Sequence, residues 1–261
     1  MATIHVLVLR APGINCDEET AFAWEAVGAV AHRVHINELR ASPALLDQYQ
    51  VLAVPGGFSY GDDIASGKIL GNQLKHHLGD DIRAFIDRGG LVVGICNGFQ
   101  VLVRMGLLPG ADTPVNLTLT LNESGRYEDR WVYLRGETDR CPFVEKGQLY
   151  HVPVAHGEGR IVTENAEAGA AQLARLDRVA LRYVSPDGGA PDFPANPNGS
   201  IENIAGLTDS TGRVFGLMPH PERCIFATQP PVTNAVFSPE NADRSEPDGL
   251  RMFRSAVRRL K

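Results

Sequence analysis

Residues 91–100 constrain the fold of this chain more than any other stretch. The first five, 91–95, are apolar, mostly β-branched and without polar alternation, which is typical of a strand buried on both faces of a parallel sheet. Cys96 follows at once, with Gly94 two positions before it and Gly98 two positions after it, and helical signals follow. A Gly-x-Cys-x-Gly turn between a strand and a helix is the thiol version of the nucleophile elbow.

This turn predicts Cys96 as a nucleophile. Glycines are needed where the chain reverses so tightly that a Cβ would clash. The turn lifts the sulfur clear of the sheet and places it at a helix N-terminus, where backbone N–H groups and the helix dipole favour a thiolate. The elbow by itself leaves one alternative open, a small buried cysteine at a strand end, which is the usual environment of a free cysteine.

Length, charge and cysteine content restrict the class of protein. With 261 residues, no internal repeat and no linker between two cores, the chain is expected to form one domain over residues 1–261. A formal charge of −6 argues against nucleic acid or an anionic membrane surface as a main partner. The four cysteines lack a C-x-x-C pair and a histidine at zinc-ligand spacing, which predicts a reduced, cytoplasmic protein without disulfides or a structural metal. No apolar segment is long enough to span a bilayer.

The first part of the chain alternates between strand and helix patterns. Strands are predicted for the apolar runs at 4–9, 30–36, 51–54 and 91–95. This alternation predicts an α/β fold of the flavodoxin-like, doubly wound kind, with a mostly parallel sheet and helices on both faces. Functional groups in such sheets gather at the carboxyl ends of the strands, where Cys96 is expected to lie.

The second part of the chain has a different sequence pattern. Residues 117–121 alternate with threonines, and 131–134 resemble their partner strand across a polar turn, which predicts an antiparallel extension of the sheet. Residues 151–160 are expected to form a strand that leads into a charged, glycine-rich loop. Residues 185–200, crowded with Pro, Gly, Asn and Asp, predict a long loop, and 226–247 predict a second irregular segment.

A glycine-rich loop follows the third predicted strand and begins with Gly56 and Gly57. It is open to three interpretations: a surface turn, a phosphate cradle or an oxyanion loop. Gly67 and Lys68 faintly resemble a P-loop, but the spacing is one residue too long and Ile69 stands where a Mg²⁺-binding hydroxyl belongs, so ATP is excluded here. Two glycines at a strand end allow a backbone N–H to point into a neighbouring site, which favours the oxyanion loop.

His220 and Glu222 follow a late apolar strand, with prolines on both sides of the histidine. In an extended segment both side chains point the same way. A carboxylate that accepts from one imidazole nitrogen leaves the other as a base and stabilises the imidazolium. The alternative is a histidine that only ends a strand. His156 and Glu158 form a second such pair, for which partner binding or internal order is favoured over catalysis.

Gly94 to Gln100, together with Pro219 to Glu222, resemble the class I (triad) glutamine amidotransferases. Further blocks narrow the resemblance to the glutaminase subunits of phosphoribosylformylglycinamidine synthase; they lie at 12–17, 55–62, 130–132, 156–160, 196–200 and 216–223. The resemblance covers about residues 4–225 and the final helix. It departs at an extra alanine, Ala11, and in a longer, family-variable segment near 226–247.

The resemblance implies roles for residues of this chain. Cys96 attacks the carboxamide carbon of glutamine, His220 moves the proton, and Glu222 orients the imidazole ring. The backbone N–H groups of Gly57 and Asn97 hold the oxyanion. Contacts with the substrate glutamine are implied for Gly56, Gly57 and Gln100.

The resemblance also implies partners. No cofactor or metal is expected in this chain, because ATP and Mg²⁺ bind a synthetase subunit that makes formylglycinamidine ribonucleotide in de novo purine biosynthesis, and a small accessory subunit completes the enzyme. Partner contacts are expected at 58–63 and 156–160. The alternatives are a glutaminase subunit of another amidotransferase, a DJ-1-like cysteine hydrolase, which lacks the late Pro-His-Pro-Glu, and a regulatory binding subunit whose elbow is a relic.

Overall fold

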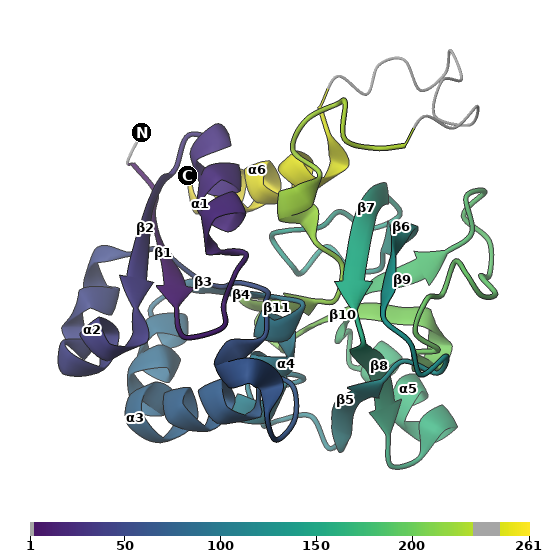
Figure 1. The fold of residues 1–261 in the computed structure, drawn as a ribbon, viewed down its shortest axis with the longest axis horizontal. Helices are drawn as coiled ribbons and strands as arrows, with labels where there is room; N and C mark the ends of the chain where they lie inside the picture. The colour runs from purple at the N-terminus through teal and green to yellow at the C-terminus, as the bar shows by residue number, and fades with distance from the viewer. Residues whose placement is uncertain (1–2, 232–245) are drawn as a thin grey trace.

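The computed structural model describes residues 3–231 and 246–261. Within them, nine strands form a mixed sheet in the order β2-β1-β3-β4-β11-β10-β9-β6-β7 (Figure 1), and β5 and β8 form a separate pair. The strands are β1 (His5–Arg10), β2 (Val30–His35), β3 (Val51–Val54), β4 (Leu91–Ile95), β5 (Leu117–Leu121), β6 (Glu128–Gly136), β7 (Leu149–His156), β8 (Glu158–Thr163), β9 (Val179–Val184), β10 (Ile204–Thr208) and β11 (Val214–Leu217).

The parallel half of the sheet brings three strand ends together. β1 pairs with β2 and β3, β3 pairs with β4, and β4 pairs with β11, all in parallel. Gly94 near the end of β4 is in register with Val54 on one side and with Gly216 on the other. The chain segments that follow β3, β4 and β11 therefore start at one edge of the sheet, as the strand and helix alternation predicts.

The antiparallel half confirms the predicted extension of the sheet but not its predicted pairing. β6 pairs with β7 on one side and β9 on the other, so both of its edges are occupied. The predicted pairing of residues 117–121 with 131–134 is therefore wrong, and β5 pairs with β8 instead. Asn122, just after β5, donates to the backbone oxygens of Arg126 and His156 and so ties the connecting turn to the end of β7.

Two other loop expectations have different outcomes. Residues 156–160 do not form a glycine-rich loop, because only Gly157 separates the end of β7 from the start of β8. Most of the stretch 185–200 is irregular, as predicted, and Asn198 fixes it by donating to the backbone oxygen of Gly159 at 2.9 Å. Of the segment 226–247, residues 232–245 lie outside the described residues.

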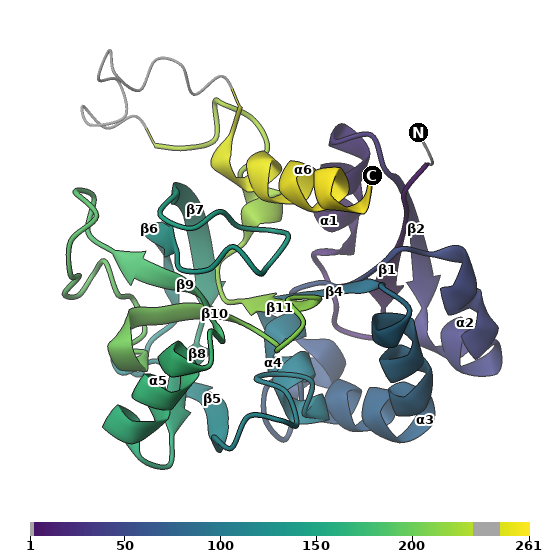
Figure 2. The ribbon, with the colours of Figure 1, turned by 180° about the vertical axis from the view of Figure 1, so that it is seen from behind.

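Helices cover the sheet from opposite sides (Figures 1 and 2). α1 and α6 lie on one side, where Trp24 and Phe253 pack edge to face with their ring centroids 5.1 Å apart, and α3 and α4 lie on the other. None of the helices in the described ranges is long and apolar enough to cross a membrane. The helices are α1 (Asp17–Ala26), α2 (Ile36–Ala41), α3 (Lys68–Asp87), α4 (Asn97–Met105), α5 (Ala166–Arg175) and α6 (Asp248–Leu260), with 3-10 turns η1 (Pro43–Gln48), η2 (Ser59–Asp62), η3 (Ile201–Asn203) and η4 (Pro221–Arg223).

Candidate active site

The elbow at Cys96 has the tight geometry that the sequence predicts. Cys96 links β4 to α4 with φ 51° and ψ −108°, a left-handed conformation that side chains rarely adopt. A Cβ on Gly94 would lie 2.5 Å from the backbone oxygen of Gly98, and a Cβ on Gly98 would lie 1.9 Å from that of Val54. The two glycines therefore permit the close approach of β3, β4 and α4 that holds the cysteine in place.

His220 and Glu222 form a buried pair. His220 Nδ1 lies 2.6 Å from Glu222 Oε1, and the two residues are 2% and 1% exposed. The backbone N–H of His220 donates to Pro153 in β7 at 2.8 Å, which fixes the turn against the sheet. The segment is a 3-10 turn and not extended as expected, because Pro221 suits a first helical position and Arg223 N closes the turn on His220 O at 3.1 Å. The two side chains meet nevertheless.

The surroundings of His220 favour its charged form. Burial opposes the imidazolium, but the Glu222 carboxylate and the negative charge that Cys96 can carry outweigh it and hold the pKa of His220 well above its ordinary value. A histidine in this setting accepts a proton readily, and the carboxylate stabilises the imidazolium that results.

Side chains from three separate segments converge over Gly56. A Cβ placed on this glycine would lie 2.9 Å from His220 Cε1, 3.2 Å from Cys16 Sγ and 3.4 Å from Cys96 Cβ. Because Gly56 has no side chain, the loop after β3 leaves room for Cys96 and His220 to lie close together. Cys96 Sγ itself lies 3.8 Å from the backbone oxygen of Ala155, and His220 Nε2 has no hydrogen-bond partner among the described residues. A hydrogen bond between a nucleophile and its catalytic base often forms or shortens only once substrate is bound.

The loop after Gly56 is held against the first loop of the chain by backbone contacts. Gly57, at φ 137°, forms an antiparallel bridge with Ile14, and a Cβ on Gly57 would lie 2.6 Å from the backbone oxygen of Gly13. Phe58 N donates to the same Gly13 oxygen at 2.8 Å. Glycine is required here because both the left-handed backbone and the close approach exclude a side chain.

Asn97 connects this loop to the elbow. Its Oδ1 accepts from Ser59 N at 3.2 Å, and its Nδ2 donates to Asp62 Oδ1 at 3.0 Å. As the first residue of α4, Asn97 has a backbone N–H without an acceptor inside the helix. An N–H at this position, next to the cysteine, is suited to binding an anion that forms there.

Gln100 is buried beside the elbow with both ends of its amide bonded within the protein. Its Nε2 donates to the backbone oxygen of Glu158 at 2.6 Å, and its Oε1 accepts from Asn97 Nδ2 at 3.1 Å. The structure therefore brings Gln100 into the neighbourhood of Cys96, and its predicted contact with a substrate remains a prediction.

His156 is held neutral by its surroundings. Burial, assisted by the charge of His220, lowers the pKa of His156 to about 3, and its Nδ1 lies 3.0 Å from Asn122 Oδ1. Such a group does not exchange protons near neutral pH. The neighbouring Glu158 contributes its backbone oxygen, not its carboxylate, to the bond with Gln100. Both observations fit the structural role favoured for this pair.

Four residues at this edge of the sheet were not singled out by sequence reasoning: Cys16, Asp62, Tyr127 and Arg223. Arg223 Nη2 donates to Cys16 Sγ at 3.0 Å across 207 positions of the chain. The pKa of Tyr127 is raised by burial and by the charge of Cys96, so this partly exposed tyrosine lies within electrostatic reach of the elbow. Arg223 directly follows Glu222 in its motif, but no local pattern indicates which distant residue each of the four contacts.

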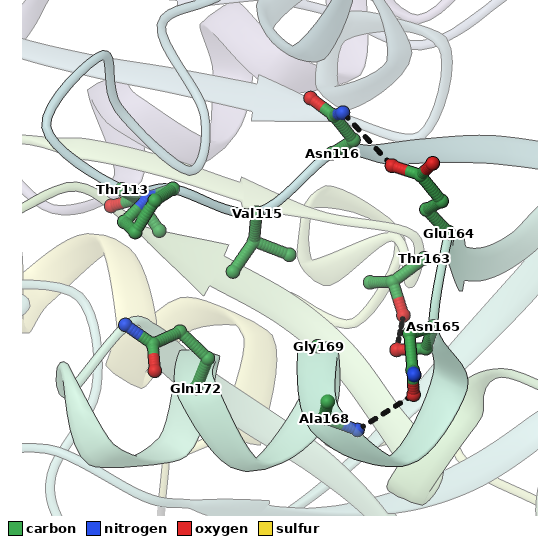
Figure 3. A pocket seen from close by; sticks show the side chains of 10 residues that line it. Thr113, Val115, Asn116, Thr163, Glu164, Asn165, Ala168, Gly169 and Gln172 are labelled. Atoms are coloured by element: carbon green, nitrogen blue, oxygen red, sulfur yellow. Dashed lines mark hydrogen bonds between the residues drawn. The ribbon is translucent and has the colours of Figure 1, made fainter.

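A separate cavity of about 660 Å³ lies away from these residues, between residues 113–116, the end of β8 and the start of α5 (Figure 3). Asn116 donates to Glu164 at 3.1 Å, and Asn165 caps α5 by accepting from Ala168 N at 3.1 Å. Several polar groups of the lining bond to one another, and neither a cysteine nor a histidine is among the lining residues.

Comparison with known proteins agrees with this geometry. The family described as CobB/CobQ-like glutamine amidotransferase domain matches residues 3–259. The chain belongs to this family. The resemblance stated from the motifs is thereby confirmed.

Individual members of the glutamine amidotransferase family match over nearly the whole chain. The subunit PurQ of phosphoribosylformylglycinamidine synthase from Dehalococcoides mccartyi is 42% identical over 262 residues, covering 99% of this chain and 98% of the relative. The PurQ subunit from Methanococcus maripaludis is 42% identical over 231 residues, covering 87% and 84%. The structure of PurLQS from Thermotoga maritima matches with a TM-score of 0.74 and 33% identity, over 100% of both chains. The predicted α/β amidotransferase fold is thus confirmed.

Proposed function

We propose that this chain is the glutaminase subunit of phosphoribosylformylglycinamidine synthase, and that it hydrolyses glutamine to glutamate and ammonia. The observation that carries the proposal is the 42% identity with PurQ of Dehalococcoides mccartyi, which extends over 99% of this chain and 98% of that one. The residues gathered over Gly56 supply the chemistry.

Cys96, His220 and Glu222 are the proposed catalytic residues. Cys96 Sγ attacks the carboxamide carbon of glutamine, and its proton passes to His220 Nε2, the ring nitrogen left without a partner among the described residues. The proton then goes to the nitrogen that leaves as ammonia, and a γ-glutamyl thioester remains on Cys96. Water cleaves the thioester, releases glutamate and restores the thiol. Glu222 holds the ring through Nδ1 at 2.6 Å.

The tetrahedral oxyanion is proposed to bind the backbone N–H groups of Asn97 and Gly57. Asn97 N is a helix N-terminal donor without an acceptor inside α4, next to the nucleophile, and the bridge to Ile14 fixes the backbone of Gly57. The loss of one such donor typically lowers the rate by about 100- to 1000-fold. Gly56 and Gln100 are proposed to contact the substrate, for which Gln100 exchanges its bond to Glu158 O for one to glutamine.

The ammonia is proposed to pass to a synthetase subunit that makes formylglycinamidine ribonucleotide, with a small accessory subunit as third component. The relative of known structure occurs as PurLQS, which supports this assembly. ATP and Mg²⁺ are proposed to bind the synthetase, with no cofactor in this chain, because the loop after β3 lacks the P-loop spacing. We place the complex in the cytoplasm and treat residues 1–261 as one amidotransferase domain.

A glutaminase assay of this chain with and without the synthetase subunit and its nucleotide tests the function. We expect low activity alone and strong stimulation in the complex, because an uncoupled site would waste glutamine. The Cys96→Ala variant should abolish glutamine-dependent amidation while the complex still uses added ammonia. A Cys96→Ala complex that still used glutamine would contradict the proposal.

The DJ-1-like alternative is separated by covalent trapping. A glutamine-mimicking chloroketone should label Cys96 in the wild type, and the labelling should depend on His220. A hydrolase of the other class would react without a preference for the glutamine side chain.

A further inference from the structure

Cys16 is a buried thiol that the proposed mechanism does not use. It directly precedes α1, is 1% exposed, and its backbone N–H donates to the oxygen of Gly56 at 3.3 Å. Its sulfur lies over the same glycine as the His220 ring. Arg223 Nη2 donates to this sulfur at 3.0 Å, and Arg223 also lies 3.6 Å from Glu19. The sulfur is therefore held in place against the catalytic imidazole.

Three different metal-binding groups meet at this point. The sulfur of Cys16, a ring nitrogen of His220 and a carboxylate oxygen of Glu222 all lie within 4.8 Å of one another, and all three residues are buried. Glu222 Oε2, on a residue that is 1% exposed, has no hydrogen-bond partner among the described residues, and Oε1 of the same carboxylate lies 2.6 Å from His220 Nδ1. Buried polar atoms without partners are costly, and a ligand that pairs with them is favoured.

We propose that Cys16, His220 and Glu222 form a binding site for a zinc ion, and that occupation of this site reversibly inhibits the enzyme. Thiolate, imidazole and carboxylate are the side chains that Zn²⁺ binds in proteins. Zn–N and Zn–S bonds of about 2.0–2.3 Å place tetrahedral ligand atoms about 3.5 Å apart. His220 Nδ1 and Glu222 Oε1, now 2.6 Å apart, have to separate by about 1 Å to admit the ion, and no two of the three ligand atoms are more than 4.8 Å apart.

Binding changes the protonation of the site in a defined way. The Cys16 thiol loses its proton to solvent and becomes a thiolate, which bonds to the metal and continues to accept from Arg223. The ion competes with the proton that joins His220 and Glu222. With the ion on Nδ1, the neutral imidazole carries its one proton on Nε2 and cannot accept the proton of Cys96, so the inhibition, though not the binding, rests on the function proposed above.

The ligand set also defines which metals bind. One sulfur and one imidazole favour Zn²⁺ and Cd²⁺, whereas Mg²⁺ prefers oxygen ligands in an octahedron. The site therefore discriminates against the Mg²⁺ that an ATP-dependent partner requires. The residues are far apart along the chain, which explains why sequence spacing did not predict a zinc site.

Direct metal binding tests the proposal independently of activity. Zn²⁺ is titrated into the full chain under chelator buffering, and Co²⁺ is used as a probe whose thiolate charge-transfer absorption reports a Co–S bond. We expect one ion per wild-type chain, and for Cys16→Ser binding weaker by about 10-fold or more and loss of the charge-transfer band. Cys141→Ser, which removes a buried thiol in another part of the fold, should bind like the wild type.

The variant Cys96→Ser separates this site from a simple metal adduct of the nucleophile. We expect it to retain Zn²⁺ affinity and the Co²⁺ band, because Cys96 is not one of the three ligands. Loss of binding in Cys96→Ser with full binding in Cys16→Ser would overturn the proposal. If Cys16→Ser does not fold, X-ray absorption of zinc-loaded Cys96→Ser decides, with one sulfur expected as a ligand of the zinc and none in the contrary case. Failure of the proposed glutaminase activity leaves these readouts unchanged.

Discussion

His220 Nδ1 lies 2.6 Å from Glu222 Oε1 in a pair that is almost completely buried. A buried carboxylate is costly unless a charge or a donor balances it, and here the imidazolium is that partner. The pair therefore sets the tautomer of His220 and leaves Nε2 on the side of the two thiols. The contribution of the His220–Glu222 pair to catalysis can be measured separately from its contribution to folding.

Glu222→Gln is expected to lower kcat for glutamine hydrolysis by about 100-fold or more, the usual contribution of general acid–base catalysis. Because the carboxylate raises the pKa of His220 against burial, its removal lowers that pKa. The imidazolium that protonates the leaving ammonia is then lost at a lower pH, so the alkaline limb of the pH profile of kcat/KM moves to lower pH. Glu19→Gln, which changes the carboxylate beside Arg223, serves as the control; an unmoved alkaline limb in Glu222→Gln would contradict the assigned role.

Gly56→Ala tests the convergence of side chains over this glycine. The new methyl group would lie 2.9 Å from His220 Cε1 and 3.2 Å from Cys16 Sγ, so the imidazole has to shift from its position. We expect a loss of about 1–3 kcal/mol in unfolding free energy from overpacking, and a fall in kcat of at least about 10-fold from misplacement of the base. Gly157→Ala is the matched control, because its methyl group would meet only Tyr127 at 3.7 Å. Wild-type kcat in Gly56→Ala would show that the space is not needed.

The parts of the fold that follow from local pattern were predictable from the sequence. The elbow at Cys96 and the parallel strands carry their signals in a few neighbouring residues. Gly94 is required by a contact within the turn, with Gly98, whereas Gly98 is also required by its close approach to Val54 in β3. The choice of strand partners is not local. β5 has the expected alternation, but its partner is decided by β7 and β9, which occupy both edges of β6.

The candidate site likewise contains one pair that local sequence predicts and one contact that it does not. His220 and Glu222 are two positions apart and were recognisable as a pair, although the turn between them is helical and not extended. The contact of Cys16 with Arg223 joins positions 207 residues apart. No periodicity or spacing rule reaches that far, since only the packing of α1 against the turn after β11 creates it.

Asp62→Ala tests the link between the oxyanion loop and the elbow. Asp62 Oδ1 accepts from Asn97 Nδ2 at 3.0 Å and from Gly67 N at 3.1 Å. The loss of both bonds is expected to lower the unfolding free energy by about 1–3 kcal/mol, and kcat by about 10-fold, because the loop that positions Gly57 N–H is then held less firmly. Asp63→Ala, an exposed neighbour, should change neither quantity. Equal kinetics for the two variants would mean that the loop does not need this anchor.

The buried His156 makes the stability of the protein depend on pH. Its pKa is about 3 in the folded protein and about 6.5 in an unfolded chain, so between these values the unfolded state binds the additional proton. The contribution of neutral His156 is complete above about pH 6.5 and is lost as the pH falls, by on the order of 1 kcal/mol per pH unit. His220 acts in the opposite sense, because its pKa is raised and its contribution is lost as the pH rises.

His156→Gln isolates this effect. The amide is able to donate to Asn122 Oδ1 but does not titrate, so the variant lacks the acid-dependent loss while His220 remains in both proteins. Urea unfolding at pH 7.5, 6 and 5 should show the variant less stable than the wild type at pH 7.5, and the difference should shrink by on the order of 1 kcal/mol for each unit below pH 6.5. Parallel losses of stability in the two proteins over this range would show that His156 is already charged in the folded state.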